Sequence, residues 1–189
     1  AGAQERAVSL SWTLHLLADL HQPLHCANLV TTERLRDLSA GGGFLVRNDG
    51  DKSVSLHAFW DRLPGEDTSV NAVLALADQL AQDPGMQPGA LRENGTNRSI
   101  PGWVQESHRI AVDFAYAADR VTFASARVVE SGQVPAAAGP KVTGSYLEAA
   151  RKIAIRRLAL AAWRLVEQLK DIGDKAPSAG ESAAAPGIP

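Results

Sequence analysis

The chain has 189 residues, of which 45% are hydrophobic and 21% charged, and its formal net charge is -2. This length and composition fit one globular domain with a hydrophobic core. The charge excludes a strongly basic surface, although phosphate can also be held through metal ions. A single cysteine, Cys26, excludes an internal disulfide, and the apolar runs are too short or too interrupted by charge for a membrane span.

The first predicted helix runs from Gln4 to Leu20. Hydrophobic residues occupy so many of its positions that few remain for a solvated face, so we expect it to be largely buried. Pro23 lacks a backbone N–H and disfavours helical angles at the residue before it. The helix should therefore end in a turn over 21–25, which redirects His25.

A glycine-rich loop follows, with a short extended piece at Phe44–Val46, and it leads to a helical turn at His57–Asp61. Hydrophobic residues on a helical period predict further helices over 69–82, from near Trp103 onward, and over 144–173, where Gly173 ends the last one. No segment alternates enough to predict a sheet. The fold class is therefore all-α.

The domain organisation follows from a change in composition near the end of the chain. Residues 1–172 are predicted to form one mainly helical domain. Residues 173–189 are rich in alanine, proline, glycine and serine, which is typical of a disordered tail. The chain begins at Ala1 without a basic segment and an apolar segment in succession, so it shows no signal peptide, and we expect further chain upstream.

Histidine and aspartate recur at a spacing that suits a metal site. His15 and Asp19 are four residues apart on a helix, which places both side chains on one face, and His57 and Asp61 repeat this spacing. A charged aspartate in so apolar a helix is costly unless a cation lies beside it. Imidazole and carboxylate suit zinc or a similar divalent ion, and His25 supplies a further ligand. The spacing predicts two adjacent metal sites.

Either pair alone is equally well explained as a hydrogen bond on a helix surface. Two pairs and His25 within so short a span favour the metal hypothesis. His21 and His108 do not repeat the spacing, so they are interpreted as supporting or surface residues rather than ligands. Trp60 is predicted to pack in the core rather than to stack on a base.

The residues themselves resemble a known family. The stretch "HLLADLHQPLH", a Gly-Gly segment and "LHAFWD" match, in order and spacing, the zinc-dependent single-strand-specific nucleases and 3'-nucleotidases of fungi, plants and bacteria. These are relatives of bacterial zinc phospholipase C. Two weaker matches, "WVQES" at Trp103–Ser107 and "RRLALAAWRL" in the last helix, extend the resemblance to about Lys170; from the residues alone, Trp103, Glu106 and Ser107 are expected to serve packing and helix start.

The resemblance implies a helical phospholipase C/nuclease-like fold around three zinc ions that hydrolyses phosphoester bonds with a metal-activated water. His25, His57 and Asp61 match the positions that bind one zinc. His15 and Asp19 match positions that serve the other two, with Asp19 bridging the metals and orienting the water. The family's N-terminal tryptophan, a nearby histidine, and a further aspartate and histidine have no match here. We therefore expect one complete zinc site and a domain incomplete at its N-terminus.

The leading functional hypothesis is an endonuclease or 3'-nucleotidase that acts on single-stranded DNA, RNA or nucleotides. The alternatives are a phospholipase C-like phosphodiesterase and a catalytically incomplete helical domain that metal stabilises. The resemblance also implies a secreted or periplasmic location. Gly43 and Ser55 stand where the family usually has asparagine, so the base preference stays open. Cys26 is expected to be a free buried thiol beside the site.

Overall fold

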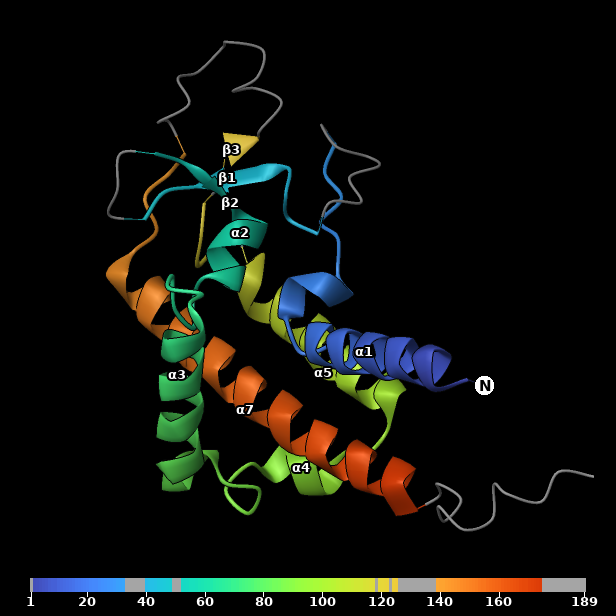
Figure 1. Ribbon diagram of the computed structural model, residues 1–189. Helices are drawn as coiled ribbons and strands as arrows, with labels where there is room; N and C mark the ends of the chain where they lie inside the picture. Colours follow the sequence, from blue (N-terminus) through green and yellow to red (C-terminus); the bar gives the residue numbers. More distant parts are fainter. Residues whose placement is uncertain are drawn as a thin grey trace, which may run out of the picture.

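The computed structural model describes residues 2–32, 40–48, 52–117, 119–122, 124–125 and 139–174, and most of them lie in helices (Figure 1). This confirms the all-α fold class. The longer helices are α1 (Ala3–Asp19), α3 (Val70–Gln82), α5 (Ile100–Ile110) and α7 (Gly144–Asp174). The shorter ones are η1 (Pro23–Cys26), α2 (Leu56–Asp61), η2 (Pro84–Met86), α4 (Arg92–Thr96) and η3 (Ala111–Ala115).

Helix α7 is the element against which the others are arranged. It runs diagonally through the molecule in Figure 1, with α1 packed against it, α3 on one side and α4 near its C-terminal end. Helix α5 packs closely against η1 and continues into η3, a single π-helical turn. These contacts bring the end of α1 and the turn after it against α5 and α7.

A small sheet covers one end of the helices, above α2 in Figure 1. Strands β1 (Phe44–Val46), β2 (Val54–Ser55) and β3 (Ala124–Ser125) pair in the order β2-β1-β3, with both pairings antiparallel. The sequence predicts only the extended piece over β1. Strands of two or three residues are too short to show the alternation by which a sheet is recognised.

Side-chain caps fix where several helices begin. The hydroxyl of Ser55 accepts a hydrogen bond from the Ala58 N–H at the start of α2, and Ser69 does the same for the Ala72 N–H of α3. Helix α5 begins three residues before Trp103. Helix α7 continues through Gly173, which was predicted to end it, and ends at Asp174. Of the predicted tail over 173–189, residues 175–189 lie outside the described residues.

The main core lies between the sheet, α2, η3 and the first half of α7. Trp60 is 1% exposed, and its indole N–H donates to the hydroxyl of Tyr146, which in turn donates to the Ala115 carbonyl. Burial raises the pKa of Tyr146 to about 12, so this hydroxyl stays protonated. Trp60 therefore packs in the core, as predicted.

Helix α1 does not have the predicted burial. Leu17 is its buried residue, whereas the other large hydrophobic side chains are exposed, among them Val8, Leu10, Trp12, Leu14 and Leu16. The hydrophobic pattern is real, but α7 contacts only one side of the helix, and the described residues place no second layer over the rest. The prediction of a largely buried helix was wrong for this reason.

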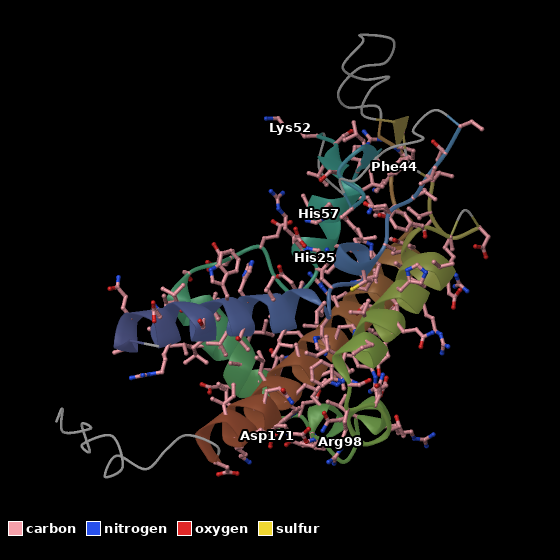
Figure 2. All side chains as sticks on the ribbon, turned by 90° about the vertical axis from the view of Figure 1, so that its right-hand side faces the viewer. His25, Phe44, Lys52, His57, Arg98 and Asp171 are labelled. Atoms are coloured by element: carbon pink, nitrogen blue, oxygen red, sulfur yellow. The ribbon has the colours of Figure 1, made fainter. Side chains whose placement is uncertain are left out.

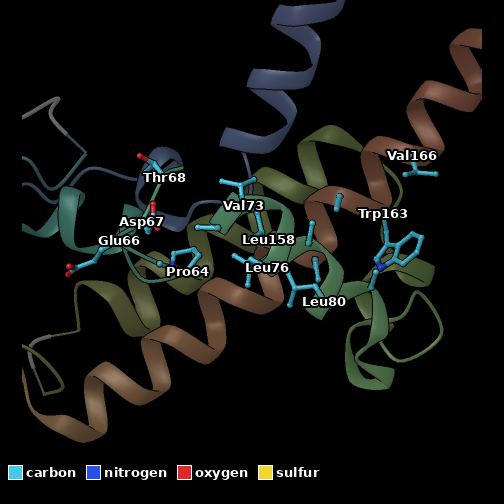
Figure 3. Close-up of a pocket in the computed structure, with 16 residues that line it drawn as sticks. Pro64, Glu66, Asp67, Thr68, Val73, Leu76, Leu80, Leu158, Trp163 and Val166 are labelled. Carbon is cyan, nitrogen blue, oxygen red and sulfur yellow. The ribbon is translucent and has the colours of Figure 1, made fainter. Parts of the chain in front are cut away.

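Helix α3 also leaves hydrophobic surface uncovered. None of its residues is buried, and a groove of about 700 Å³ runs between it and α7 (Figure 3). Leu76 and Leu80 line the groove from α3, and Leu158 and Trp163 line it from α7. None of the helices in the described part of the chain combines the length and hydrophobicity that a membrane crossing requires.

Candidate metal centre

The end of α1 and the turn after it carry three of the predicted ligands. His15 and Asp19 lie one turn apart, with Nε2 of His15 3.3 Å from Oδ2 of Asp19. The chain then turns into η1, which places Nδ1 of His25 3.7 Å from the same Asp19 oxygen. Oδ2 of Asp19 thus lies between the imidazoles of His15 and His25.

Helix α2 supplies the other two. Nε2 of His57 lies 3.2 Å from Oδ2 of Asp61, and Nε2 of His25 lies 3.8 Å from Oδ1 of Asp61. The rings of His25 and His57 are nearly parallel, with 5.0 Å between their centroids and an angle of 7° between their planes. Figure 2 shows these two histidines beside one another, between α1 and the sheet.

His25, His57 and Asp61 fit a divalent metal ion. Each offers one donor atom, and these atoms lie within 4.8 Å of one another; the part of the chain that the structure describes holds one such group of three. A tetrahedral zinc ion with bonds of about 2 Å places its ligand atoms roughly 3.3 Å apart. The 3.2 Å between Nε2 of His57 and Oδ2 of Asp61 is close to this value, and the 3.8 Å between Nε2 of His25 and Oδ1 of Asp61 is longer.

A backbone carbonyl orients His57. Its Nδ1 lies 3.0 Å from the Ala40 carbonyl oxygen, which can only accept a hydrogen bond. Nδ1 therefore donates in this contact, and Nε2 is the ring nitrogen that faces Asp61. Histidine ligands of metals are commonly held in this way.

The glycine-rich loop brings that carbonyl into place. Gly41 has a φ of 88°, and a Cβ there would lie 3.2 Å from Leu24 and from the hydroxyl of Tyr116 and 3.4 Å from the His57 nitrogen. Only glycine combines this backbone conformation with this close approach. The described part of the loop thus places the Ala40 carbonyl beside His57.

A buried ionic network lies below the cluster. Oε2 of Glu106 accepts hydrogen bonds from Arg157 at 2.7 Å and from Arg164 at 2.8 Å. Burial by itself would raise the pKa of Glu106, but the bonds from Arg164 and Arg157 outweigh it and lower this pKa to about 2. Glu106 and Ser107 were expected to serve packing and helix start; they instead hold buried polar groups, while Trp103 does pack in the core.

This network holds the turn between Asp19 and His25. Nε of Arg157 donates to the His21 carbonyl at 3.1 Å, and the Ser107 hydroxyl donates to the Leu20 carbonyl at 2.5 Å. His21 is buried, and desolvation, together with the nearby Arg157, lowers its pKa to about 4. A neutral His21 can donate from Nδ1 to the Leu17 carbonyl and accept from Arg164 at Nε2.

The other histidine and the cysteine lie outside the cluster. His108 is exposed, with Nδ1 3.1 Å from the Cys26 carbonyl oxygen. Cys26 is a free, half-buried thiol whose Sγ lies 3.4 Å from the Leu20 carbonyl oxygen, and burial raises its pKa. Sequence reasoning missed Gln22, whose side-chain amide donates to Oδ1 of Asp61 at 2.9 Å.

A hollow of about 760 Å³ opens beside the cluster. Asp19, His25 and His57 line it, together with apolar side chains from α1 and α5. The cluster is therefore accessible from solvent, in contrast to the ionic network below it. The hydrophobic groove between α3 and α7 is a separate feature and includes none of the predicted ligands.

Comparison with known proteins gives two findings. The S1/P1 Nuclease family model matches residues 1–174. Nuclease S1 of Aspergillus oryzae is 23% identical over 164 residues, which make up 85% of this chain and 53% of that protein. The chain thus spans about half the length of the curated relative it matches. Among solved structures, none matches the chain.

Proposed function

Because this chain belongs to the S1/P1 nuclease family, we propose that it is part of a zinc-dependent enzyme that hydrolyses phosphoester bonds in single-stranded nucleic acid and 3'-nucleotides. One observation carries the proposal: His25, His57 and Asp61, from two segments of the chain, place their donor atoms within 4.8 Å of one another. Two imidazoles and one carboxylate leave a coordination position open for water, as catalytic zinc sites do.

The proposed residue roles follow from these positions. His25, His57 and Asp61 hold one zinc ion. Asp19 lies beside this zinc site and, together with His15, contributes ligands to a neighbouring metal site. When bound, zinc lowers the pKa of a water molecule and neutralises charge on the phosphate and the leaving oxygen. Asp19 accepts a hydrogen bond from the attacking water and orients it. No side-chain nucleophile is needed.

The site at His15 and Asp19 needs further ligands. Among the described residues, these two form no group of three donors like that of His25, His57 and Asp61. We propose that polypeptide outside residues 1–189 supplies the rest, giving three zinc ions in all. Two observations support this: the aligned region covers 53% of Nuclease S1, and Trp12 and Leu16 beside His15 are 58% and 52% exposed. Family membership also favours a secreted or periplasmic location.

The first experiment measures zinc per chain by elemental mass spectrometry, for the 189-residue chain and for its Asp61→Ala and Asp78→Ala variants. We expect near one zinc per chain, near none in Asp61→Ala, and no change in Asp78→Ala, since Asp78 is exposed on α3. An unchanged zinc content in Asp61→Ala would overturn the ligand assignment.

Activity is then assayed on single-stranded DNA, 3'-AMP and phosphatidylcholine, with the same chain and with a version that includes any coding sequence upstream. We expect cleavage of DNA and 3'-AMP to need the longer version. Hydrolysis of phosphatidylcholine alone would favour the phospholipase C-like alternative. Bound zinc with no hydrolysis of any substrate by the longer version would favour a metal-stabilised domain without catalysis.

A further inference from the structure

Gln22 makes two hydrogen bonds with opposite ends of its side chain. Its Oε1 accepts from the Leu24 N–H, which caps η1, and its Nε2 donates to Oδ1 of Asp61 at 2.9 Å. The Leu24 N–H can only donate, so the amide oxygen must face it, and the NH₂ group must face Asp61. The orientation of the amide is therefore determined by its own partners.

The backbone immediately before Gln22 is fixed by more distant elements. The Leu20 carbonyl accepts from Ser107 of α5, and the His21 carbonyl accepts from Arg157 of α7. Arg157 is 4% exposed, and the charge of Glu106 neutralises it. Gln22 thus extends from a backbone that α5 and α7 hold in place, and its amide is held by the Leu24 N–H.

The contact holds one end of the Asp61 carboxylate. Oδ1 accepts from Gln22 and lies 3.8 Å from Nε2 of His25, while Oδ2 lies 3.2 Å from Nε2 of His57. Asp61 is 43% exposed at its side chain, so without Gln22 its carboxylate would be free to rotate into solvent. The bond also joins the turn that carries His25 to the helix that carries His57, across 39 residues of sequence.

We propose that Gln22 is a positioning residue that holds Asp61 in the orientation needed to bind a divalent cation together with His25 and His57. The inference rests on the proposed metal site. Groups that hydrogen-bond to metal ligands typically contribute 10- to 100-fold to metal affinity. Loss of the Gln22 amide should therefore weaken zinc binding by about 10-fold or more.

Two variants separate this role from the cap of η1. Gln22→Ser keeps an oxygen at the N-cap position but cannot reach Asp61. Gln22→Met keeps the length of the side chain but has neither donor nor acceptor. Gln22→Ser keeps the cap of η1 and Gln22→Met loses it, but both variants lose the hydrogen-bond donor to Asp61. Gln87→Ser is a matched control, because the Gln87 amide donates to the Ala81 carbonyl at 2.7 Å in a part of the chain outside the cluster.

The experiment titrates the full 189-residue chain with zinc against a competing chelator, records the visible absorption of the cobalt-substituted protein, and measures thermal unfolding without metal. We expect both Gln22 variants to bind zinc at least about 10-fold more weakly and to show an altered cobalt spectrum. Gln22→Ser should unfold near the wild-type temperature without metal, and Gln87→Ser should bind zinc normally.

The two failures are distinguishable. Wild-type zinc affinity and cobalt spectrum in Gln22→Ser and Gln22→Met would overturn the role of Gln22 and leave the metal site intact. Equal weakening in Gln87→Ser would also overturn it, because the effect would then be a general loss of structure. If the unsubstituted chain binds neither zinc nor cobalt, both this inference and the proposed function fall.

Discussion

Glu106 lies between two arginines that are almost completely buried, Arg157 and Arg164, and its side chain is 18% exposed. Its folded pKa of about 2 is below the ordinary value of 4.5. As pH falls, the unfolded chain therefore takes up the proton first. The stability that Glu106 contributes is fully present above pH 4.5 and is lost as pH falls from 4.5 toward 2.

Glu106→Gln should destabilise the protein at pH 7 by about 3 kcal/mol, because two buried guanidinium groups lose their counter-charge. Urea unfolding at pH 7 and at several acidic pH values measures the effect. The difference in unfolding free energy between wild type and variant should become smaller below pH 4.5. Glu148→Gln is the control, since the Glu148–Lys152 pair lies in solvent and contributes little. If this difference in unfolding free energy stayed constant down to pH 3, the ion pairs of Glu106 with the two arginines would not be its cause.

The predicted ligands and the missed supporting residues differ in how far apart their partners lie. The His15–Asp19 and His57–Asp61 pairs are visible in the sequence because a helix brings residues four apart together. Gln22 meets Asp61 across 39 residues, and Arg157 meets the His21 carbonyl across 136. No local pattern marks such partners, so sequence reasoning could find the ligands but not what holds them.

At the scale of elements, helix α1 offers a test of exposure with two adjacent leucines. Leu17 is 7% exposed and Leu16 is 52% exposed. We expect Leu17→Ala to cost about 2–5 kcal/mol of stability and Leu16→Ala to cost less than about 0.5 kcal/mol, as measured by urea unfolding of the 189-residue chain. Equal costs would mean that α1 is covered on both sides in solution.

The same pair tests the proposed cover of α1. If further polypeptide packs over this helix in a longer version of the protein, the cost of Leu16→Ala should rise there, because the side chain then leaves a cavity. The cost of Leu17→Ala should not change. An unchanged, small cost for Leu16→Ala in the longer protein would contradict the proposal that α1 receives a second layer.

Helix positions were easier to predict than helix surroundings. The period of hydrophobic residues predicted a helix over 69–82, and α3 runs from Val70 to Gln82. That period shows which residues prefer burial, but it does not show which partner buries them. The burial predicted for α1 failed for this reason, and the small sheet was missed because β2 and β3 have two residues each.

For the whole molecule, the uncovered hydrophobic surfaces have a measurable consequence. The exposed side of α1 and the groove between α3 and α7 carry several large hydrophobic side chains that no other element covers in the described part of the chain, and such surfaces favour association. We expect the 189-residue chain to associate with itself as its concentration rises, by sedimentation velocity. Val8→Lys and Val73→Lys, on α1 and in the groove, should reduce this association. Gln105→Lys, on the exposed side of α5, is the control for added charge.

A chain that stays monomeric at every concentration would contradict this account. So would association that all three variants reduce equally. The first result would mean that the surfaces are covered within the chain. The second would mean that net charge, rather than these hydrophobic surfaces, controls association. Composition could not have predicted the effect, because 45% hydrophobic residues is ordinary and only their placement on α1 and α3 is unusual.

The hydrogen bond from Arg157 to the His21 carbonyl joins residues that are made at very different times during synthesis. All five predicted ligands lie within residues 15–61 and leave the ribosome early, yet the turn that carries His25 is held by Arg157 and, through His21, by Arg164. Contacts of such sequence separation form late. A nascent chain that has passed Asp61 has all five predicted ligands but no fixed turn, so we expect tight metal binding at the proposed site only after α7 has been made. The last helix, which contains no predicted ligand, would thus decide when the proposed site is complete in this chain.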